Sequence, residues 1–169
     1  YGSLLATKLA LAGHNAKLIC LPDEVSLINK EGTLVRMPVK GREGLYDISS
    51  KKLSGKIEAI GPDQVNADEF DLAVLAMQEP QYRSADIKNV IKGLAEAKTP
   101  CMSIMNMPPL TYLKRINGLD TTKYRDSYAD ASVWDQLDPN LMTLCSPDPQ
   151  AFRPPDEPIN VLQVRLPTN

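Results

Sequence analysis

Two apolar runs separated by a helical pattern constrain the fold of this chain more than any other feature. The run FDLAVLAM at 70–77 predicts a buried strand, and TPCMSIMN at 99–106 predicts a second one. Apolar side chains between residues 87 and 94 recur at helical spacing, and Ser84 is placed to cap the start of that helix. A strand, a helix and a strand in this order predict two parallel strands joined by a right-handed crossover.

The first segment shows the same alternation. YGSLLATKLALAGH at 1–14 has the pattern of an apolar helix, and Gly13 suits the left-handed position after its last turn. AKLICL at 16–21 then predicts a buried strand. A helix followed at once by a strand is half of a βαβ unit, so we expect a strand before Tyr1 that is missing from this chain.

The remaining sequence predicts elements at the margins of a sheet. Residues 32–49 predict a hairpin around KGREG, and Pro38 indicates that its own strand lies at an edge. Beyond Arg115 the sequence is polar and rich in proline, which predicts edge strands joined by long loops, with candidates at 141–146 and 160–167. We therefore predict an α/β fold, a Rossmann-like, doubly wound and mostly parallel sheet with helices on both faces.

Composition excludes several classes of function. The net charge is −2 and only 5% of residues are aromatic, whereas a nucleic-acid partner would leave a basic stripe or stacking aromatics. No apolar run approaches the roughly 20 residues of a membrane span, so we expect no membrane contact. The three cysteines are far apart and lack metal-ligand spacing. Two of them sit inside apolar runs, so we expect buried thiols in a cytoplasmic protein. His14 follows a glycine at a helix end and is expected on a turn, not as a catalytic base.

The acidic residues are expected at the surface and not at a metal site. Asp68, Glu69 and Asp71 precede a strand at the end away from the expected cleft. The acidic segment beyond Arg115 is expected to carry surface charge on Asp126, Asp130, Asp135 and Asp138.

Ligands of a parallel α/β sheet bind beyond the carboxyl ends of its strands. The sequence places three such ends at 20–22, 77–79 and 105–107, and the helix start at Gly2 and Ser3 adds free N–H groups that face an anion. Asp23 and Glu24 follow the first of these ends, where an acid would bind the ribose of NAD, but we interpret them as a solvated helix start. The choice between NAD and NADP therefore stays open.

Two amides follow the later strands directly. Gln78 could donate to a phosphate or a ribose, and Asn106 could hold a carboxamide or a substrate hydroxyl. Each amide could equally tie down its own loop. Their convergence on one edge of the sheet favours a binding role.

The segments YGSLLATKLALAGHNAKLI, FDLAVLAMQEPQ and SIMN, at this spacing, resemble the N-terminal domain of the ketopantoate reductases (2-dehydropantoate 2-reductases) from Tyr1 to about Arg115. The resemblance implies that residues 1–169 form an NAD(P)-binding domain of an oxidoreductase. Such an enzyme uses NADPH to reduce a 2-oxo acid to a 2-hydroxy acid in pantothenate biosynthesis. A lysine acid would come from a helical substrate domain after residue 169, and the expected assembly is a homodimer.

The resemblance implies a cofactor site at the first helix and the strand after it. Gly2 matches the last glycine of the family's G-x-G-x-x-G fingerprint, with Ser3 beside it. Leu21 stands where the family commonly has an arginine for the 2′-phosphate of NADP.

The later strand ends also match the family in part. Gln78, after Met77, replaces a lysine in a K-x-x-Q pattern whose glutamine is matched by Gln81. Asn106 matches the asparagine of a Q-N-G motif that touches nicotinamide and substrate, so an orienting catalytic role is implied for it. Residues 107–109, Met-Pro-Pro, replace the glycine of that motif.

The leading hypothesis is an NAD(P)-dependent oxidoreductase acting on a 2-oxo acid. A second hypothesis is a nucleotide-binding sensor module that no longer catalyses, supported by the replacement of the lysine and the arginine. A third is another Rossmann dehydrogenase of the opine or 6-phosphogluconate type, because these share the helical partner domain.

Overall fold

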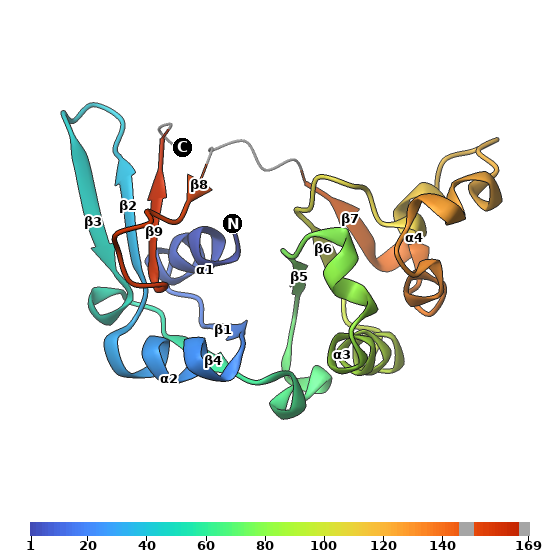
Figure 1. The fold of residues 1–169 in the computed structure, drawn as a ribbon, viewed down its shortest axis with the longest axis horizontal. Helices are drawn as coiled ribbons and strands as arrows, with labels where there is room; N and C mark the ends of the chain where they lie inside the picture. The colour runs from blue at the N-terminus through green and yellow to red at the C-terminus, as the bar shows by residue number, and fades with distance from the viewer. Residues whose placement is uncertain (146–150, 166–169) are drawn as a thin grey trace. The chain divides into compact units, whose positions relative to one another are not determined.

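The computed structural model describes residues 1–145 and 151–165. The chain forms two compact units (Figure 1). The first unit comprises Tyr1–Gly61 and Asp148–Asn169, and the second unit comprises Pro62–Pro147.

The first unit begins with a helix and a strand, as predicted. Helix α1 (Gly2–Leu11) is followed by Gly13 at φ +91°, in the left-handed region predicted for it. Strand β1 (Ala16–Ile19) then pairs in parallel with β4 (Ile57–Ile60) over their full lengths. The N-terminal half of the chain therefore contains the parallel pairing expected of an α/β fold.

Helix α2 (Pro22–Glu31) connects to the edge of β4 through one side chain. The Nδ2 of Asn29 donates to the Ala59 carbonyl at 2.8 Å, and its Oδ1 accepts from the Ala59 N–H at 2.9 Å. This amide makes both hydrogen bonds that a neighbouring strand would make, so it fixes α2 against the strand edge.

A second sheet of the first unit contains the predicted hairpin. Its order is β3-β2-β9-β8, with bounds β2 (Leu34–Pro38), β3 (Leu45–Ser49), β8 (Ala151–Phe152) and β9 (Val161–Val164). The hairpin pairs are antiparallel, and β9 joins β2 in parallel. Leu4 of α1 packs into the core of this sheet with Val35 and Val164.

The prediction that Pro38 marks an edge strand is wrong. Strand β2 lies between β3 and β9. The pairing with β9 covers only Leu34 to Arg36, whereas Pro38 pairs with Leu45 of β3. Proline is tolerated because it falls beyond the last residue that β9 pairs, where its missing N–H is not needed.

The second unit contains the predicted strand–helix–strand. Strands β5 (Ala73–Leu75), β6 (Cys101–Ser103) and β7 (Met142–Leu144) form one parallel sheet in the order β5-β6-β7. Helix α3 (Ala85–Glu96) begins after Ser84 and buries its apolar face in the same core. The predicted α/β class, with mostly parallel pairing and flanking helices, is confirmed.

The two strands predicted after Arg115 form as β7, which lies at the edge of its sheet, and β9. The rest of this segment differs from the predicted long loops. Apart from β7 and the second-sheet strands β8 and β9, this segment is organised by short helical turns that enter the core of the second unit. The short helices of the chain are α4 (Leu110–Leu113), η1 (Ser50–Lys52), η2 (Pro62–Gln64), η3 (Ala67–Glu69), η4 (Glu79–Arg83), η5 (Thr121–Ser127), η6 (Ala131–Asp135) and η7 (Pro139–Leu141). Aspartate side chains cap η5, η6 and η7 by accepting from the backbone N–H two residues on: Asp120, Asp130 and Asp138.

An aromatic cluster fills the core of this segment. Trp134 is fully buried, and its ring lies 4.9 Å from the ring of Tyr82 and 6.4 Å from that of Tyr128, measured between centroids. The Thr111 hydroxyl donates to the Trp134 carbonyl at 2.5 Å, which ties α4 to η6. These non-local contacts order a segment whose sequence has little strand or helix pattern.

Two aspartates of this segment form ion pairs, so they are more than surface charge. Hydrogen bonds from Arg125, together with Lys114, lower the pKa of Asp135 to about 2. Hydrogen bonds from Lys88 and then Ser132 lower the pKa of Asp130 to about 2. Both carboxylates are therefore stabilised in the folded state relative to the unfolded chain.

We expect these pairs to make the free energy of unfolding depend on pH. The unfolded chain, whose aspartates titrate near 3.8, takes up protons before the folded chain does, so stability falls as the pH is lowered from about 4 to about 2. Asp135→Asn should flatten this slope, as measured by urea unfolding at a series of pH values. Asp126→Asn, at an exposed position of the preceding helix η5, is the control, and equal slopes for wild type and Asp135→Asn would contradict the prediction.

Candidate functional site

Two unpaired amides lie at the carboxyl ends of neighbouring parallel strands in the second unit. The register aligns Leu75 of β5 with Ser103 of β6, so Gln78 and Asn106 each stand three residues beyond a paired position. Both side chains are exposed, and neither has a hydrogen-bond partner in the part of the chain that the structure describes. Met77 is half-buried and packs against the core.

Gln81 has a local role in this turn. Its Oε1 accepts from the Gln78 N–H at 2.8 Å, which closes the first turn of η4. Gln81 is thereby held by the backbone, whereas the exposed Gln78 side chain makes no cap hydrogen bond in this turn. The structure thus brings Met77, Gln78, Gln81 and Asn106 together at one edge of one sheet.

A buried carboxylate that the sequence analysis did not single out holds the loops of this edge together. Glu79 is 6% exposed, and both of its oxygens accept from the Ala129 N–H, at 3.2 and 3.1 Å. The neighbouring Tyr128 hydroxyl donates to the Pro108 carbonyl at 2.7 Å, just beyond Asn106. Burial, and then the charge of Glu79, raise the pKa of Tyr128, so the phenol stays protonated as a donor. One segment therefore fixes both the Gln78 loop and the Asn106 loop.

The other predicted residues lie in the first unit. Gly2 and Ser3 form the first turn of α1 and are half-buried. Leu21 is 69% exposed and precedes α2, and its N–H donates to Glu24 Oε2 at 3.4 Å.

The interpretation of Asp23 and Glu24 as a helix start is confirmed, but Glu24 is less solvated than expected. Its side chain is 16% exposed, and its Oε1 pairs with Arg153 Nη1 at 2.9 Å. Asp23 beside it is exposed, as expected. The sequence L-P-D-E carries a recognisable signal, a proline at the first helical position and a glutamate two residues later, but nothing local predicts Arg153.

Cys20 directly follows β1 and lies beside this ion pair. Burial, and then the charge of Glu24, raise the pKa of the Cys20 thiol to about 11, so it stays neutral near pH 7. Burial alone raises the pKa of Cys101 to about 11, and this thiol is buried as predicted. Cys145 is exposed, contrary to the expectation of buried thiols, because it follows the last residue of β7.

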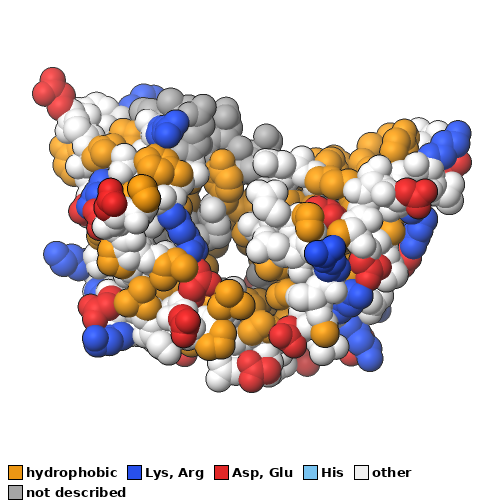
Figure 2. Space-filling model, in the orientation of Figure 1, with side chains coloured by type: hydrophobic (Ala, Val, Ile, Leu, Met, Phe, Trp, Pro, Cys, Tyr) orange, Lys and Arg blue, Asp and Glu red, His pale blue; other side chains and the backbone are white. Residues whose placement is uncertain are grey.

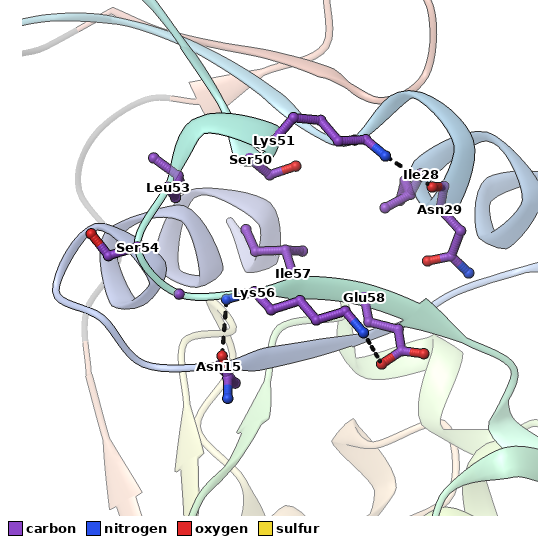
Figure 3. Close-up of a pocket in the computed structure, with 12 residues that line it drawn as sticks. Asn15, Ile28, Asn29, Ser50, Lys51, Leu53, Ser54, Lys56, Ile57 and Glu58 are labelled. Carbon is purple, nitrogen blue, oxygen red and sulfur yellow. Dashed lines mark hydrogen bonds and ion pairs between the residues drawn. The ribbon is translucent and has the colours of Figure 1, made fainter.

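A cavity of about 640 Å³ opens at the other end of the first unit (Figure 3). It is bordered by Asn15 and Lys56, which precede β1 and β4, and by the end of α2. Lys51 Nζ donates to the Asn29 carbonyl, and Lys56 pairs with Glu58 (Figure 3). Since ligands of this fold bind at carboxyl ends, this cavity at the amino ends is not the expected cofactor site.

The structure also describes His14, the grouping of possible metal ligands, the character of the helices and the surface charge. His14 is exposed just after the turn that ends α1, as predicted. Among residues 1–145 and 151–165, no three His, Cys, Asp or Glu side chains are grouped so as to hold a metal ion. No helix in these same ranges combines the length and apolar character needed to cross a membrane. Figure 2 shows acidic and basic side chains interspersed on the face in view.

Comparisons with known proteins give one structural likeness. No family model matches the sequence, and no curated protein matches it. The fold is similar to the crystal structure of a "putative ketopantoate reductase" from Ralstonia solanacearum MolK2, with a TM-score of 0.63 and 14% sequence identity. The match covers 96% of this chain and 46% of that one, so this chain spans about half the length of that protein. The likeness confirms the Rossmann-like fold.

Proposed function

We propose that this chain is the dinucleotide-binding domain of an NAD(P)-dependent oxidoreductase that reduces a 2-oxo acid to a 2-hydroxy acid. The observation that carries the proposal is the pair of free amides, Gln78 and Asn106, beyond adjacent parallel strands of a Rossmann-like fold. A structural neighbour described as a ketopantoate reductase supports the same class of reaction.

Each unit, taken by itself, offers groups of the kind that bind a dinucleotide. The first turn of α1 offers N–H groups at Gly2 and Ser3 for a pyrophosphate, and a guanidinium lies beside the end of β1. The unpaired amides at the edge of the second unit offer two N–H donors each to a carboxamide, ribose or substrate oxygen. The nicotinamide, when bound, supplies the hydride.

This chain's own residues would bind the substrate and orient its carbonyl group. Asn106 donates to the substrate oxygen and holds the carbonyl carbon in line for reduction, and the Glu79–Ala129 and Tyr128–Pro108 bonds keep its loop in place. By resemblance, the proton for the forming hydroxyl comes from a lysine outside residues 1–169.

A turnover assay of the full-length protein tests the proposal. NADPH or NADH is mixed with a panel of 2-oxo acids, ketopantoate among them, and loss of the reduced-nicotinamide absorbance is followed. We expect turnover with at least one acid. Absence of turnover with every acid and both cofactors would overturn the enzyme proposal.

Asn106→Ala is expected to lower kcat/KM by about 10- to 100-fold, because misplacing the reacting carbonyl by about 1 Å costs rates of this order. The cofactor Kd should change far less, since the pyrophosphate contacts lie elsewhere. The control is Asn117→Ala, which truncates another exposed asparagine of the second unit. Steady-state kinetics and cofactor titration give the two readouts, and an unchanged kcat/KM would remove Asn106 from the site.

A non-catalytic nucleotide sensor is the second candidate. The observation that favours it is the uncharged pair Leu21 and Gln78, which stand where the resembled family has an arginine and a lysine. Dinucleotide binding without turnover of any 2-oxo acid would favour this function over the first.

A further inference from the structure

We propose that Arg153 is the residue that selects NADP over NAD, by binding the 2′-phosphate of the cofactor's adenosine ribose. This inference rests on the proposed function and adds to it the group that distinguishes the two cofactors. Arg153 stands 132 positions after Leu21, where an arginine would ordinarily be sought in the sequence.

Arg153 lies at the turn where this fold binds the adenosine ribose. In a Rossmann fold the adenosine ribose is bound at the carboxyl end of the strand that follows the first helix, by an acid for NAD or near an arginine for NADP. Here that strand is β1, and the turn after it contains Cys20 and Leu21, which can do neither. The Arg153 guanidinium reaches this turn through Glu24, whose two oxygens contact Arg153 Nη1 at 2.9 Å and the Leu21 N–H at 3.4 Å.

The backbone at Arg153 is held by the second sheet of the first unit. Arg153 directly follows β8, whose residues Ala151 and Phe152 pair with β9, and β9 in turn pairs with β2. The backbone that carries Arg153 is therefore fixed by a four-stranded sheet.

Arg153 is the more exposed partner of its ion pair with Glu24. The Glu24 side chain is 16% exposed, and its oxygens already accept from Arg153 and Leu21. The Arg153 side chain is 49% exposed, and one of its guanidinium nitrogens makes the contact with Glu24. A guanidinium carries five N–H donors in a planar fork, so the pair offers donors and positive charge to a ligand.

This arrangement favours a phosphate over a ribose hydroxyl as the ligand. A covered carboxylate whose oxygens are used is a poor acceptor for the ribose 2′-hydroxyl of NAD. A half-exposed guanidinium is suited to bidentate contact with a phosphate dianion. The neutral Cys20 thiol adds no negative charge at this turn, and the exposed Asp23 is the one further acid of its first helical turn. The geometry therefore favours NADP.

Direct binding measurements test this inference. NADPH and NADH are titrated into the full-length protein, followed by calorimetry or reduced-nicotinamide fluorescence, for wild type, Arg153→Ala, Arg153→Lys and the control Arg42→Ala. Arg42 is exposed in the hairpin turn of the same unit, so its truncation changes net charge equally. Thermal unfolding without cofactor checks that each variant is folded.

We expect Arg153→Ala to weaken NADPH binding about 10- to 100-fold while NADH binding changes less than about twofold. Arg153→Lys, which keeps the charge but loses the fork, should lose an intermediate amount, and Arg42→Ala should match wild type. If Arg153→Ala changes neither affinity, or lowers both equally, the inference fails and the proposed function stands. If wild type binds neither dinucleotide, the proposed function fails and this inference with it.

Discussion

Replacing Trp134 by alanine is expected to lower the free energy of unfolding by about 3–5 kcal/mol, the usual cost of deleting a large buried aromatic side chain. Trp134 has no exposed surface and contacts the rings of Tyr82 and Tyr128. Stabilities of about 5–15 kcal/mol are usual for such domains, so the loss would be a large share of the total. Urea unfolding followed by far-UV circular dichroism measures it.

Two further variants separate cavity formation from other effects. The Trp134 Nε1 is buried without a hydrogen-bond partner among the described residues. Trp134→Phe keeps most of the ring contact and removes this unpaired donor, so it should cost clearly less than alanine. Tyr124→Ala, at an exposed aromatic of the same segment, should stay within about 0.5 kcal/mol of wild type. An alanine variant at 134 as stable as wild type would show that the cluster does not form.

The cluster also connects to the candidate site. Tyr82 belongs to η4, the turn that Gln78 and Gln81 close, and Tyr128 donates to the loop after Asn106. Loss of the Trp134 ring would therefore loosen both loops that carry the free amides. We expect Trp134→Ala to impair cofactor binding even at temperatures where the protein remains folded.

Local patterns predicted the elements of this fold well and their partners less well. The helix over 85–96 and the strands at 16–19, 73–75 and 101–103 follow from residue spacing alone, because their apolar faces are set locally. The place of β9 beside β2 could not be predicted, since it joins segments more than a hundred residues apart. The prediction of an edge strand at Pro38 was wrong for the same reason. Whether the missing N–H of a proline costs a hydrogen bond depends on where a distant strand stops pairing.

The candidate site was predictable where it depends on strand ends. Gln78 and Asn106 were found because parallel strands place their carboxyl ends at one edge. The helix start at Glu24 was also predictable, but its low exposure was not, because it depends on Arg153, a partner 129 residues away. Glu79 gave no signal, since a lone glutamate after a strand usually faces water, and only the Ala129 N–H explains its burial.

Gly55→Ala is the second substitution expected to have a large effect, and here the cause is contact between two backbone segments. The Gly55 N–H donates to the Ala10 carbonyl at 2.9 Å, at the end of α1. A methyl group at Gly55 would lie 2.0 Å from the His14 carbonyl oxygen and 2.9 Å from the Ala10 Cα. Neither atom belongs to a flexible side chain. The segment that leads into β4 would therefore have to move away from α1.

We expect this displacement to cost at least about 3 kcal/mol of unfolding free energy, the upper end of the usual range for overpacking. Gly93→Ala is the matched control, because its methyl group would meet only the Ala67 Cβ, at an ordinary 3.8 Å. That substitution should stabilise α3 by about 0.5–1 kcal/mol, since alanine is the better helix former. The two glycines should thus give opposite signs in the same urea experiment. Equal effects would show that the approach to β4 does not pass this closely against the turn after α1, and would remove the steric reason for glycine at position 55.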